Sequence, residues 1–429
     1  MKVFFYTLGC KVNQYETEGM RELFINRNDE ITSEIKEADV VIINSCTVTA
    51  ESDRKTRQTI RRHRRLAPHA VIVVTGCMVQ ASPEKFETLP EADLWVGNNH
   101  LAQIPEMVDQ FLKENQRSCF VTDHPYGEAY ATPNITDFSE RTRAYLKIED
   151  GCDRYCSYCI IPFARGHVRS RSLEEIRLET EQLSQKGYTE IVLVGINLSA
   201  YGFGKEFDLC DAVAVVGSVD GIHRVRLGSL EPDHITDEML MRLKEQSKFC
   251  PQFHLSLQSG CDATLKRMNR HYDSAFYEDL VCRIRRIFPD SSITTDIMVG
   301  FPGETAEEFS QSLAFADKIG FAKAHVFIYS KRKGTVAAQL PNQVPASVAE
   351  QRSHEMIQHC SESEQQFYEK QIGQTVSVLF ESEHHGIYEG YTPNYTRVQV
   401  SSADNLTGRL CQVMLESTEN NVCRGKIIE

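Results

Sequence analysis

Short apolar runs that alternate with helical stretches are the feature that most limits how this chain can fold. Near the N-terminus the runs are KVFFYTLGC, ADVVIINSC, AVIVVTGC and ADLWVGN. Helical patterns occur at residues 13–26, 52–66 and 104–113. Such runs are typical of parallel strands that helices cover on both faces. We therefore predict a small parallel α/β domain over residues 1–114.

The same alternation returns after a break. Residues 115–140 contain proline and glycine and show no period, so they are expected to form a linker. Beyond them the strand-like runs are AYLKIEDG, EIVLVGIN, RVRLGSL, FHLSLQSG, ITTDIMVGF and KAHVFIYS. Six strand-helix units predict a full or partial barrel of parallel strands over residues 141–370, with functional residues at the C-terminal ends of its strands.

The last segment has a different pattern. A long polar helical stretch at 346–370 precedes the alternating runs TVSVLFES, GIYEGYTPNYTRVQVS, GRLCQVMLES and VCRGKIIE. These short strands predict a small antiparallel β-barrel over residues 371–429. The expected architecture is thus α/β and multidomain.

The composition limits the class of protein. A chain of 429 residues with 41% apolar and 25% charged residues is typical of a globular protein of several domains. No apolar run approaches the about 20 residues of a membrane span, and no export signal is visible. We expect a cytoplasmic protein without membrane contact, whose 14 cysteines favour metal or catalytic roles over disulfides. The net charge of −13 argues against nucleic-acid binding by the whole surface, but not by local patches.

Three cysteines stand together directly after the first strand of the expected barrel. In GCDRYCSYC, Cys152, Cys156 and Cys159 have the spacing C-x3-C-x2-C. Three thiolates on one loop can hold three irons of a 4Fe-4S cluster and leave the fourth iron open. A structural zinc site needs four closed ligands, and only His167 is near enough to be a fourth. Zinc binding and incidental cysteines are therefore the weaker interpretations.

Three further cysteines each end a predicted strand of the first domain. Cys10, Cys46 and Cys77 lie far apart in sequence, but the carboxyl ends of neighbouring parallel strands converge on one crevice. We predict that they hold a second cluster with an open iron. The alternative is that they are buried as small hydrophobic residues.

Polar residues and glycines follow other strands of the barrel. Asn197, Ser256, Gln258 and Gly300 stand near C-terminal strand ends, where they are candidates for cofactor binding. A glycine after a strand is more often an ordinary turn, so these residues support the cysteine motif but cannot replace it.

The motifs GC-x2-N, NSC-x-VT and TGC, followed by C-x3-C-x2-C, resemble the methylthiotransferase family of the radical S-adenosylmethionine (SAM) superfamily over essentially the whole chain. The resemblance implies two 4Fe-4S clusters and SAM as cofactors, an N-terminal domain with the auxiliary cluster, and a C-terminal TRAM domain that binds RNA. Tyr158 matches the family position that packs near the adenine of SAM.

Three segments resemble one branch of that family. TLGCKVNQYET, ARGHVRSR and EGYTPNYTRV are most similar to enzymes that methylthiolate carbon 2 of N6-threonylcarbamoyladenosine at tRNA position 37. One SAM would provide the methyl group, and a second would provide the radical that removes hydrogen from this unactivated carbon. Two other functions stay open: the same reaction on isopentenyladenosine or on a ribosomal protein, and redox sensing by an RNA-binding iron-sulfur protein without turnover.

The resemblance implies the tRNA anticodon stem-loop and an electron donor such as flavodoxin or ferredoxin as partners. The candidates for RNA contact are Arg54, Arg57, Arg61, Arg65, Tyr391 and Tyr395. The arginines form a basic face on one predicted helix, and the tyrosines are candidates for stacking on unpaired bases. A solvated charged face and core tyrosines are the alternatives. Further basic clusters occur at 165–171, 283–286 and 331–333, whereas the tail from Gln371 onward has seven acidic and four basic residues.

Overall fold

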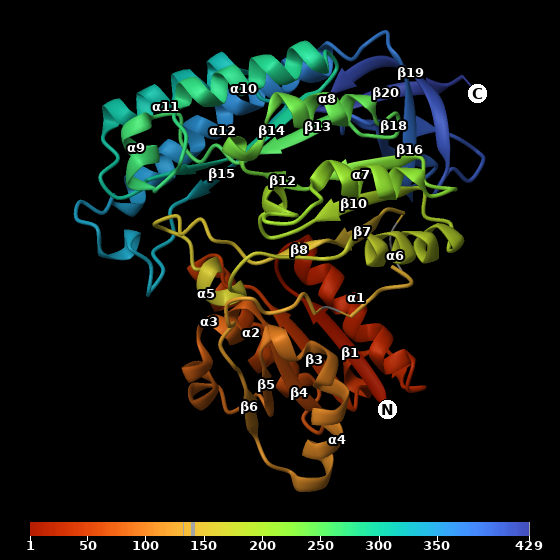
Figure 1. Cartoon of the computed structure of the whole chain (residues 1–429), viewed down its shortest axis with the longest axis vertical. Helices are drawn as coiled ribbons and strands as arrows, with labels where there is room; N and C mark the ends of the chain where they lie inside the picture. Colours follow the sequence, from red (N-terminus) through yellow and green to blue (C-terminus); the bar gives the residue numbers. More distant parts are fainter. Residues whose placement is uncertain (132, 139–141, 429) are drawn as a thin grey trace.

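The computed structural model describes residues 1–131, 133–138 and 142–428, and three groups of elements follow one another along the chain (Figure 1). The strands of the first group are β1 (Lys2–Thr7), β2 (Glu30–Ile31), β3 (Val40–Ser45), β4 (Val71–Gly76), β5 (Leu94–Val96) and β6 (Ser118–Phe120). They form one sheet in the order β2-β1-β3-β4-β5-β6, with every neighbouring pair parallel. The predicted parallel α/β domain is confirmed.

Helices cover both faces of this sheet. They are α1 (Lys11–Ile25), α2 (Ala50–Leu66), α3 (Cys77–Ala81) and α4 (Ile104–Glu114). Strands β3 and β4 are buried at every position, because alternate residues pack against α2 and α3 on one face and against α1 and α4 on the other. β6 lies in the segment expected to be a linker, so the sheet extends beyond residue 114. The expected start of the barrel domain, at residues 140 and 141, lies outside the described residues.

The second group forms an open barrel. Its strands are β7 (Ala144–Lys147), β10 (Glu190–Val194), β11 (Arg224–Leu227), β12 (Ser229–Leu230), β13 (Gln252–Leu255), β14 (Ser292–Val299) and β15 (Lys323–Ile328). They pair in parallel in two sheets, β11-β10-β7 and β12-β13-β14-β15. An isolated parallel bridge pairs Val225 of β11 with Phe249, which lies shortly before β13. Among the described residues β7 and β15 do not pair with each other, so the barrel is partial.

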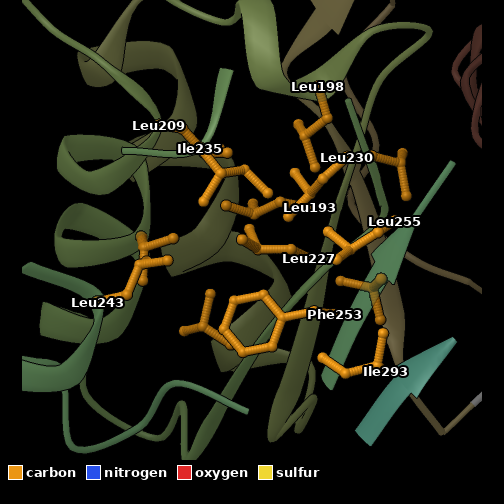
Figure 2. Packing of buried hydrophobic residues seen from close by; sticks show 14 of the residues in the cluster. Leu193, Leu198, Leu209, Leu227, Leu230, Ile235, Leu243, Phe253, Leu255 and Ile293 are labelled. Carbon is orange, nitrogen blue, oxygen red and sulfur yellow. The ribbon is translucent and has the colours of Figure 1, made fainter. Parts of the chain in front are cut away.

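The helices of this domain lie outside the strands. They are α6 (Leu173–Gln185), α7 (Leu209–Ser218), α8 (Asp237–Glu245), α9 (Asp262–Arg267), α10 (Ser274–Ile287), α11 (Ala306–Ile319) and α12 (Ala346–Glu369). Figure 2 shows the core between strands and helices, where Leu193, Leu227 and Phe253 cluster with Leu209 and Leu243. A short loop region with α5 (Ile161–Arg165) and the two-stranded pair β8 (Glu149–Asp150) and β9 (Arg169–Ser170) follows β7. This region carries the second cysteine trio.

The third group is a closed five-stranded barrel. Its strands are β16 (Thr375–His384), β17 (Ile387–Tyr391), β18 (Arg397–Ser401), β19 (Leu410–Glu419) and β20 (Val422–Ile427). The order is β16-β17-β18-β20-β19, and β18 and β20 are parallel while the other pairs are antiparallel. The barrel agrees with the prediction, apart from this one parallel pair. None of the helices in the described part of the chain has the length and apolar character needed to cross a membrane.

Candidate functional site

The first cysteine trio lies at the C-terminal edge of three neighbouring strands. Cys10 precedes α1, Cys46 follows β3, and Cys77 begins α3 after β4. Burial raises the pKa of the Cys77 thiol to about 12; Arg165 acts against this shift, and the nearby thiols of Cys46 and Cys10 contribute to it. Burial also raises the pKa of Cys46, with Cys10 adding to it. Each thiol of the trio is therefore close enough to act electrostatically on the other two, as predicted from the strand ends.

Two glycines allow this close approach. Gly9 has φ +112°, and a Cβ on it would lie 3.0 Å from the Cβ of Cys46. Gly76 has φ +93°, and a Cβ there would lie 2.4 Å from the carbonyl oxygen of Ser45. Only glycine accepts both the left-handed backbone and the lack of space. These two positions let the loops that carry the cysteines touch.

Asn13 holds the same loops together. Its Nδ2 donates to the carbonyl oxygens of Leu8 at 3.0 Å and Ser45 at 2.9 Å. The Asn44 amide donates back to the carbonyl oxygen of Asn13 at 2.9 Å. Because buried amides need such partners, these bonds fix the positions from which Cys10 and Cys46 extend.

The second trio lies on the loop after β8. The backbone N–H of Cys152 donates to the carbonyl of Gly166, and that of Cys159 donates to Cys156, both at 2.9 Å. Burial raises the pKa of Cys159 to about 12, with Cys156 adding to it, and raises that of Cys152 above its ordinary value, with Cys159 and Cys156 adding to it. The loop therefore gathers its three thiols as the spacing predicts.

The side chains of the two trios do not form a site for a single metal ion. Within the described residues, no three His, Cys, Asp or Glu side chains are close enough to share one metal ion. A 4Fe-4S cluster binds each cysteine through a different iron, so its ligands are spread wider than those of one ion. His167, the candidate fourth ligand for zinc, is instead bonded through Nδ1 to Asp153 at 2.5 Å.

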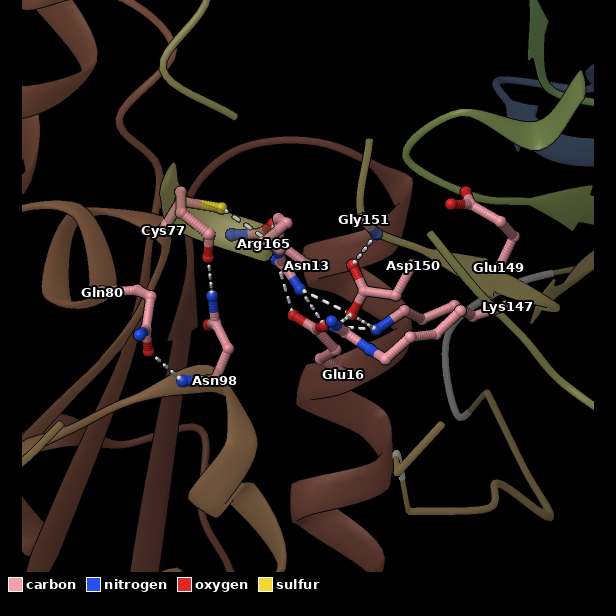
Figure 3. Close-up of polar contacts among 12 residues, drawn as sticks. Asn13, Glu16, Cys77, Gln80, Asn98, Lys147, Glu149, Asp150, Gly151 and Arg165 are labelled. Atoms are coloured by element: carbon pink, nitrogen blue, oxygen red, sulfur yellow. Dashed lines mark hydrogen bonds and ion pairs between the residues drawn. The ribbon is translucent and has the colours of Figure 1, made fainter. Parts of the chain in front are cut away.

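A buried arginine connects the first trio to the loop of the second (Figure 3). Arg165 donates from Nε to the Sγ of Cys77 at 3.2 Å and from Nη2 to Asn13 Oδ1 at 3.2 Å. Its guanidinium also bonds to both carboxylate oxygens of Glu16 in α1. Lys147 lies 2.7 Å from Glu16 and 2.7 Å from Asp150, which completes a network with no solvent-exposed charge. The first domain and the partial barrel thus share one ionic core beside Cys77.

A second cation lies beside the other trio. Arg270 Nη1 is 3.2 Å from Cys156 Sγ, and its Nη2 is 2.5 Å from Glu231 and 3.1 Å from the carbonyl oxygen of Ser256. Positive charge next to a thiol favours its thiolate form, which is the form that binds iron. Each trio therefore has one arginine in contact with one of its cysteines.

The expected cofactor residues fall into two groups. The carbonyl oxygen of Ser256 and the Sγ of Cys156 both contact Arg270. The backbone N–H of Asn197 donates to Glu149 Oε2 at 2.7 Å, and Glu149 acts electrostatically on Cys152. The side-chain oxygen of Asn197 and the Oε1 of Glu149 are buried without a hydrogen-bond partner in the described structure. Burial raises the pKa of Glu149 well above its ordinary value, so this carboxyl group favours its neutral form.

The other three expected cofactor residues have contacts within the protein that account for their positions. Tyr158 packs edge to face on Phe301, with ring centres 6.4 Å apart. Gln258 has φ +69° and is bonded through its backbone to β14. A Cβ on Gly300 would lie 2.6 Å from the Cβ of Ala349, so the packing of α12 explains this glycine.

The expected RNA residues have mixed surroundings. Arg54 and Arg61 are exposed and paired with Glu51 and Glu91 at 2.5 and 3.4 Å, Arg57 is half-buried, and Arg65 is exposed. Tyr391 and Tyr395 stack on each other with ring centres 4.6 Å apart, and the guanidinium of Arg143 lies 5.2 Å from both rings. The tyrosines therefore connect the C-terminal barrel to the partial barrel, and the ring faces that stack on each other are already occupied.

The ionic core and the burial of several arginines are not predicted from the sequence. The cluster at 165–171 was expected to be a basic surface patch, but Arg165 and Arg171 are buried, and Arg171 pairs with Glu179 at 2.6 Å. Arg332, from the cluster at 331–333, is also buried and lies 3.0 Å from Asp53 of α2. The acidic pair that directly precedes GC in KIEDGC was the one local signal of buried cations nearby.

Comparisons with known proteins agree with this geometry. Residues 2–97 match the model of a family described as uncharacterized protein family UPF0004, and residues 146–316 match that of the radical SAM superfamily. The chain is 37% identical over 420 residues to threonylcarbamoyladenosine tRNA methylthiotransferase MtaB of Bacillus subtilis, covering 96% of this chain and 93% of that protein. It is 36% identical to the protein of the same name from Thermotoga maritima, over 99% of this chain and 97% of that one. It is 32% identical to tRNA-2-methylthio-N(6)-dimethylallyladenosine synthase of Clostridium perfringens, with the same coverage of 99% and 97%.

Among solved structures, the radical SAM methyltransferase TsrM of Kitasatospora setae is similar, with a TM-score of 0.58 at 14% identity, over 79% of this chain and 77% of that one. At this identity the likeness concerns the fold alone. A partial barrel with a C-x3-C-x2-C loop after its first strand defines a radical SAM enzyme. With its sequence relatives and the N-terminal cysteine domain, the chain belongs to the radical SAM methylthiotransferase family, whose cofactors are two 4Fe-4S clusters and SAM.

Proposed function

We propose that this enzyme converts N6-threonylcarbamoyladenosine at tRNA position 37 into its 2-methylthio derivative. The observation that carries the proposal is the contact of Arg165, on the loop of one cysteine trio, with Cys77 of the other. Methylthiolation needs two clusters that act on one substrate, and this contact joins the loop region of the second trio to a cysteine of the first across the domain boundary. The names of the more similar relatives support the substrate.

In this proposal each trio holds one cluster. Cys152, Cys156 and Cys159 hold the cluster that binds SAM, and Cys10, Cys46 and Cys77 hold the auxiliary cluster. When bound, SAM and the two clusters supply the radical, the sulfur and the methyl group of the reaction. Arg165 and Arg270 neutralise charge beside the thiolates, and the burial of Cys46 and Cys77 excludes water from the auxiliary site.

We further propose that the SAM pocket lies at the strand ends next to the second trio. The unpartnered oxygens of Asn197 and Glu149 are available to the amino group of SAM, and Ser256 lies beside Cys156 through Arg270. Buried polar atoms without partners are rare, so a bound ligand is their natural partner. Tyr158 and Gln258 would line the adenine side, while the packing role of Gly300 makes it the weakest member of this set.

The anticodon stem-loop of the tRNA would contact the basic face of α2. On the basic face of α2, Arg54 and Arg61 form ion pairs, whereas Arg57 and Arg65 form none in the described structure. Arg57 and Arg65 are therefore the best candidates for phosphate contacts. We propose that the C-terminal barrel acts as a TRAM-like RNA-binding domain over 371–429. A flavodoxin or ferredoxin would deliver the electron, and the site of action would be the cytoplasm.

The test is nucleoside mass spectrometry of tRNA from a strain that lacks the gene. The proposal expects unmodified carbon 2 on threonylcarbamoyladenosine and restoration by the wild-type gene, but not by a Cys77→Ala variant. An unchanged level of the methylthio nucleoside without the gene would refute it. Loss of the methylthio group from isopentenyladenosine alone would instead support the other substrate.

A further inference from the structure

A cavity of about 650 Å³, lined by both polar and apolar side chains, lies between the partial barrel and the C-terminal barrel. Strands β11, β13, β14 and β15, helix α12 and the C-terminal barrel supply most of its wall. The first domain supplies one residue, Lys11, which directly follows Cys10 and begins α1. The cavity therefore reaches the residue next to Cys10, although none of the three cysteines lines it.

Lys11 is the unpaired cation of this wall. The other basic residues that line the cavity each have a carboxylate partner. The pairs are Arg226 with Glu190 at 2.8 Å, Lys323 with Glu364 at 3.1 Å and Arg397 with Glu389 at 2.6 Å. For the Lys11 ammonium the described structure gives no hydrogen bond or ion pair, and its one contact is the Tyr145 ring, 6.0 Å away.

The charges around Lys11 have a positive excess. Arg143 and Arg226 both act on it, and they share the carboxylate of Glu190, at 3.8 and 2.8 Å. Glu381 neutralises Arg143 at 2.6 Å. Arg224 also pairs with Glu190, at 3.4 Å, so four cations including Lys11 share the carboxylates of Glu190 and Glu381. The Lys11 side chain is exposed to the cavity, which the carboxylate of Asp296 also lines. An anion at Lys11 would restore the balance.

The rest of the wall combines apolar side chains, among them Leu227 and Phe367, with polar groups. His254 bonds through Nδ1 to Thr294 at 3.0 Å, and its Nε2 lies 3.4 Å from Asp296, while His325 lies nearby with ring centres 6.0 Å apart. Such a wall exchanges hydrogen bonds with hydroxyl and urea groups. A hydrocarbon would leave these polar atoms desolvated and unpaired, which costs free energy.

Adenine chemistry connects this cavity with the reacting carbon. Carbon 2 and the carbon that bears N6 flank the same ring nitrogen, so a base with carbon 2 directed at the auxiliary trio has its N6 substituent on the adjacent side. We propose that the Lys11 ammonium binds the carboxylate of the N6-threonylcarbamoyl group in this cavity and so selects that substrate over an N6-alkyl adenosine. This inference rests on the proposed function, and it makes Lys11 a specificity-determining residue.

The experiment compares four anticodon stem-loop RNAs that differ only at position 37. They carry adenosine, threonylcarbamoyladenosine, the methyl ester of its carboxylate, or isopentenyladenosine. Dissociation constants are measured anaerobically for wild type with both clusters, for Lys11→Gln, Lys11→Arg and, as matched control, Lys318→Gln on the outer face of α11. Iron content is measured for each.

One charge-assisted hydrogen bond corresponds to a preference of about tenfold or more. Wild type, Lys11→Arg and Lys318→Gln should bind the acid more tightly than the ester by about that factor, whereas Lys11→Gln should bind acid and ester equally. Affinity for the RNA with plain adenosine should not change.

Equal binding of acid and ester by wild type would overturn the inference, whatever the variants do. So would full discrimination by Lys11→Gln. If the wild-type enzyme methylthiolates the threonylcarbamoyl RNA without discriminating acid from ester, the proposed function stands and the Lys11 inference fails. If it discriminates but yields no methylthio product, the carboxylate site stands and the proposed function fails.

Discussion

Replacing Arg165 by glutamine tests the ionic core that joins the first domain to the radical SAM domain. The guanidinium is fully buried and bonds to both carboxylate oxygens of Glu16, to Asn13 and to Cys77. Glutamine is shorter and uncharged. In the variant, Lys147 is therefore the cation that remains paired with the buried Glu16 among the described residues.

The expected loss follows from this geometry. Removing one partner of a buried ion pair costs about 3–5 kcal/mol, because the remaining charge stays desolvated. Lys147 is 2.7 Å from Glu16 and 2.7 Å from Asp150, so it compensates in part. We expect the lower end of that range, about 3 kcal/mol, which is roughly 100-fold in the unfolding equilibrium.

The assay is anaerobic urea unfolding, with near-ultraviolet circular dichroism and iron release as the two signals. Arg165→Gln should unfold at lower urea and release iron with the same midpoint, because Arg165 contacts Cys77. Arg177→Gln is the matched control: its side chain is 42% exposed and pairs with Glu174 and Glu181, so it should change stability by less than about 1 kcal/mol. An Arg165→Gln midpoint equal to that of wild type, with full iron content, would refute the reasoning.

The same pair of proteins has a pH signature. Burial alone would raise the pKa of Asp150, but Lys147 and Arg165 hold it below its ordinary value, and Arg165 and Lys147 do the same for Glu16. A carboxyl group with a lowered pKa in the folded state adds stability above its unfolded pKa of about 4, and this stability is lost as the pH falls. The stability difference between wild type and variant, measured on the apoproteins, should therefore be largest near neutral pH and shrink toward acid pH. A difference that grows toward acid pH would contradict the assigned charges.

Three other changes test separate parts of the site. Alanine at Cys10, Cys46 and Cys77 together should lower iron and sulfide by about half, since one of two clusters is lost. Arg57→Gln and Arg65→Gln should each reduce the slope of log affinity against log salt for tRNA by about 0.7–0.9, the value of one phosphate contact. Tyr391→Ala should lower stability by about 1–2 kcal/mol, because it removes an aromatic stack and a cation–π contact between two domains. Its affinity for tRNA with plain adenosine at position 37 should stay near that of wild type.

Each of these has a clear contrary outcome. Full iron in the triple alanine variant, compared with exposed Cys119→Ala as control, would remove the auxiliary site from the proposal. An unchanged slope of log affinity against log salt would indicate that the basic face of α2 is solvated and does not contact phosphate. A large loss of tRNA affinity in a stable Tyr391→Ala variant would restore the interpretation that this ring stacks on RNA bases.

The order of strands and helices could be predicted because it depends on local patterns. The largely apolar VVIINS and VIVVTG runs indicate strands buried on both faces, and they are the central strands β3 and β4. The convergence of Cys10, Cys46 and Cys77 follows from the rule that parallel strands end on one edge. β6 was missed because three residues with no apolar pattern pair only through an existing sheet edge. The parallel β18–β20 pair depends on barrel closure, which no local pattern encodes.

The sequence by itself determined the chemistry of the two trios, since spacing along a loop and position at strand ends are local properties. Only the tertiary structure decided which charges are buried: Glu16 and Arg165 are 149 positions apart, and their pairing turned an expected RNA-binding patch into an ionic core beside Cys77. The same holds for Tyr391 and Tyr395, which looked like stacking platforms and are joined to Arg143 across a domain boundary. A charged or aromatic residue has the same local signature on a surface and in an interface. The partner that distinguishes the two comes from a distant part of the chain.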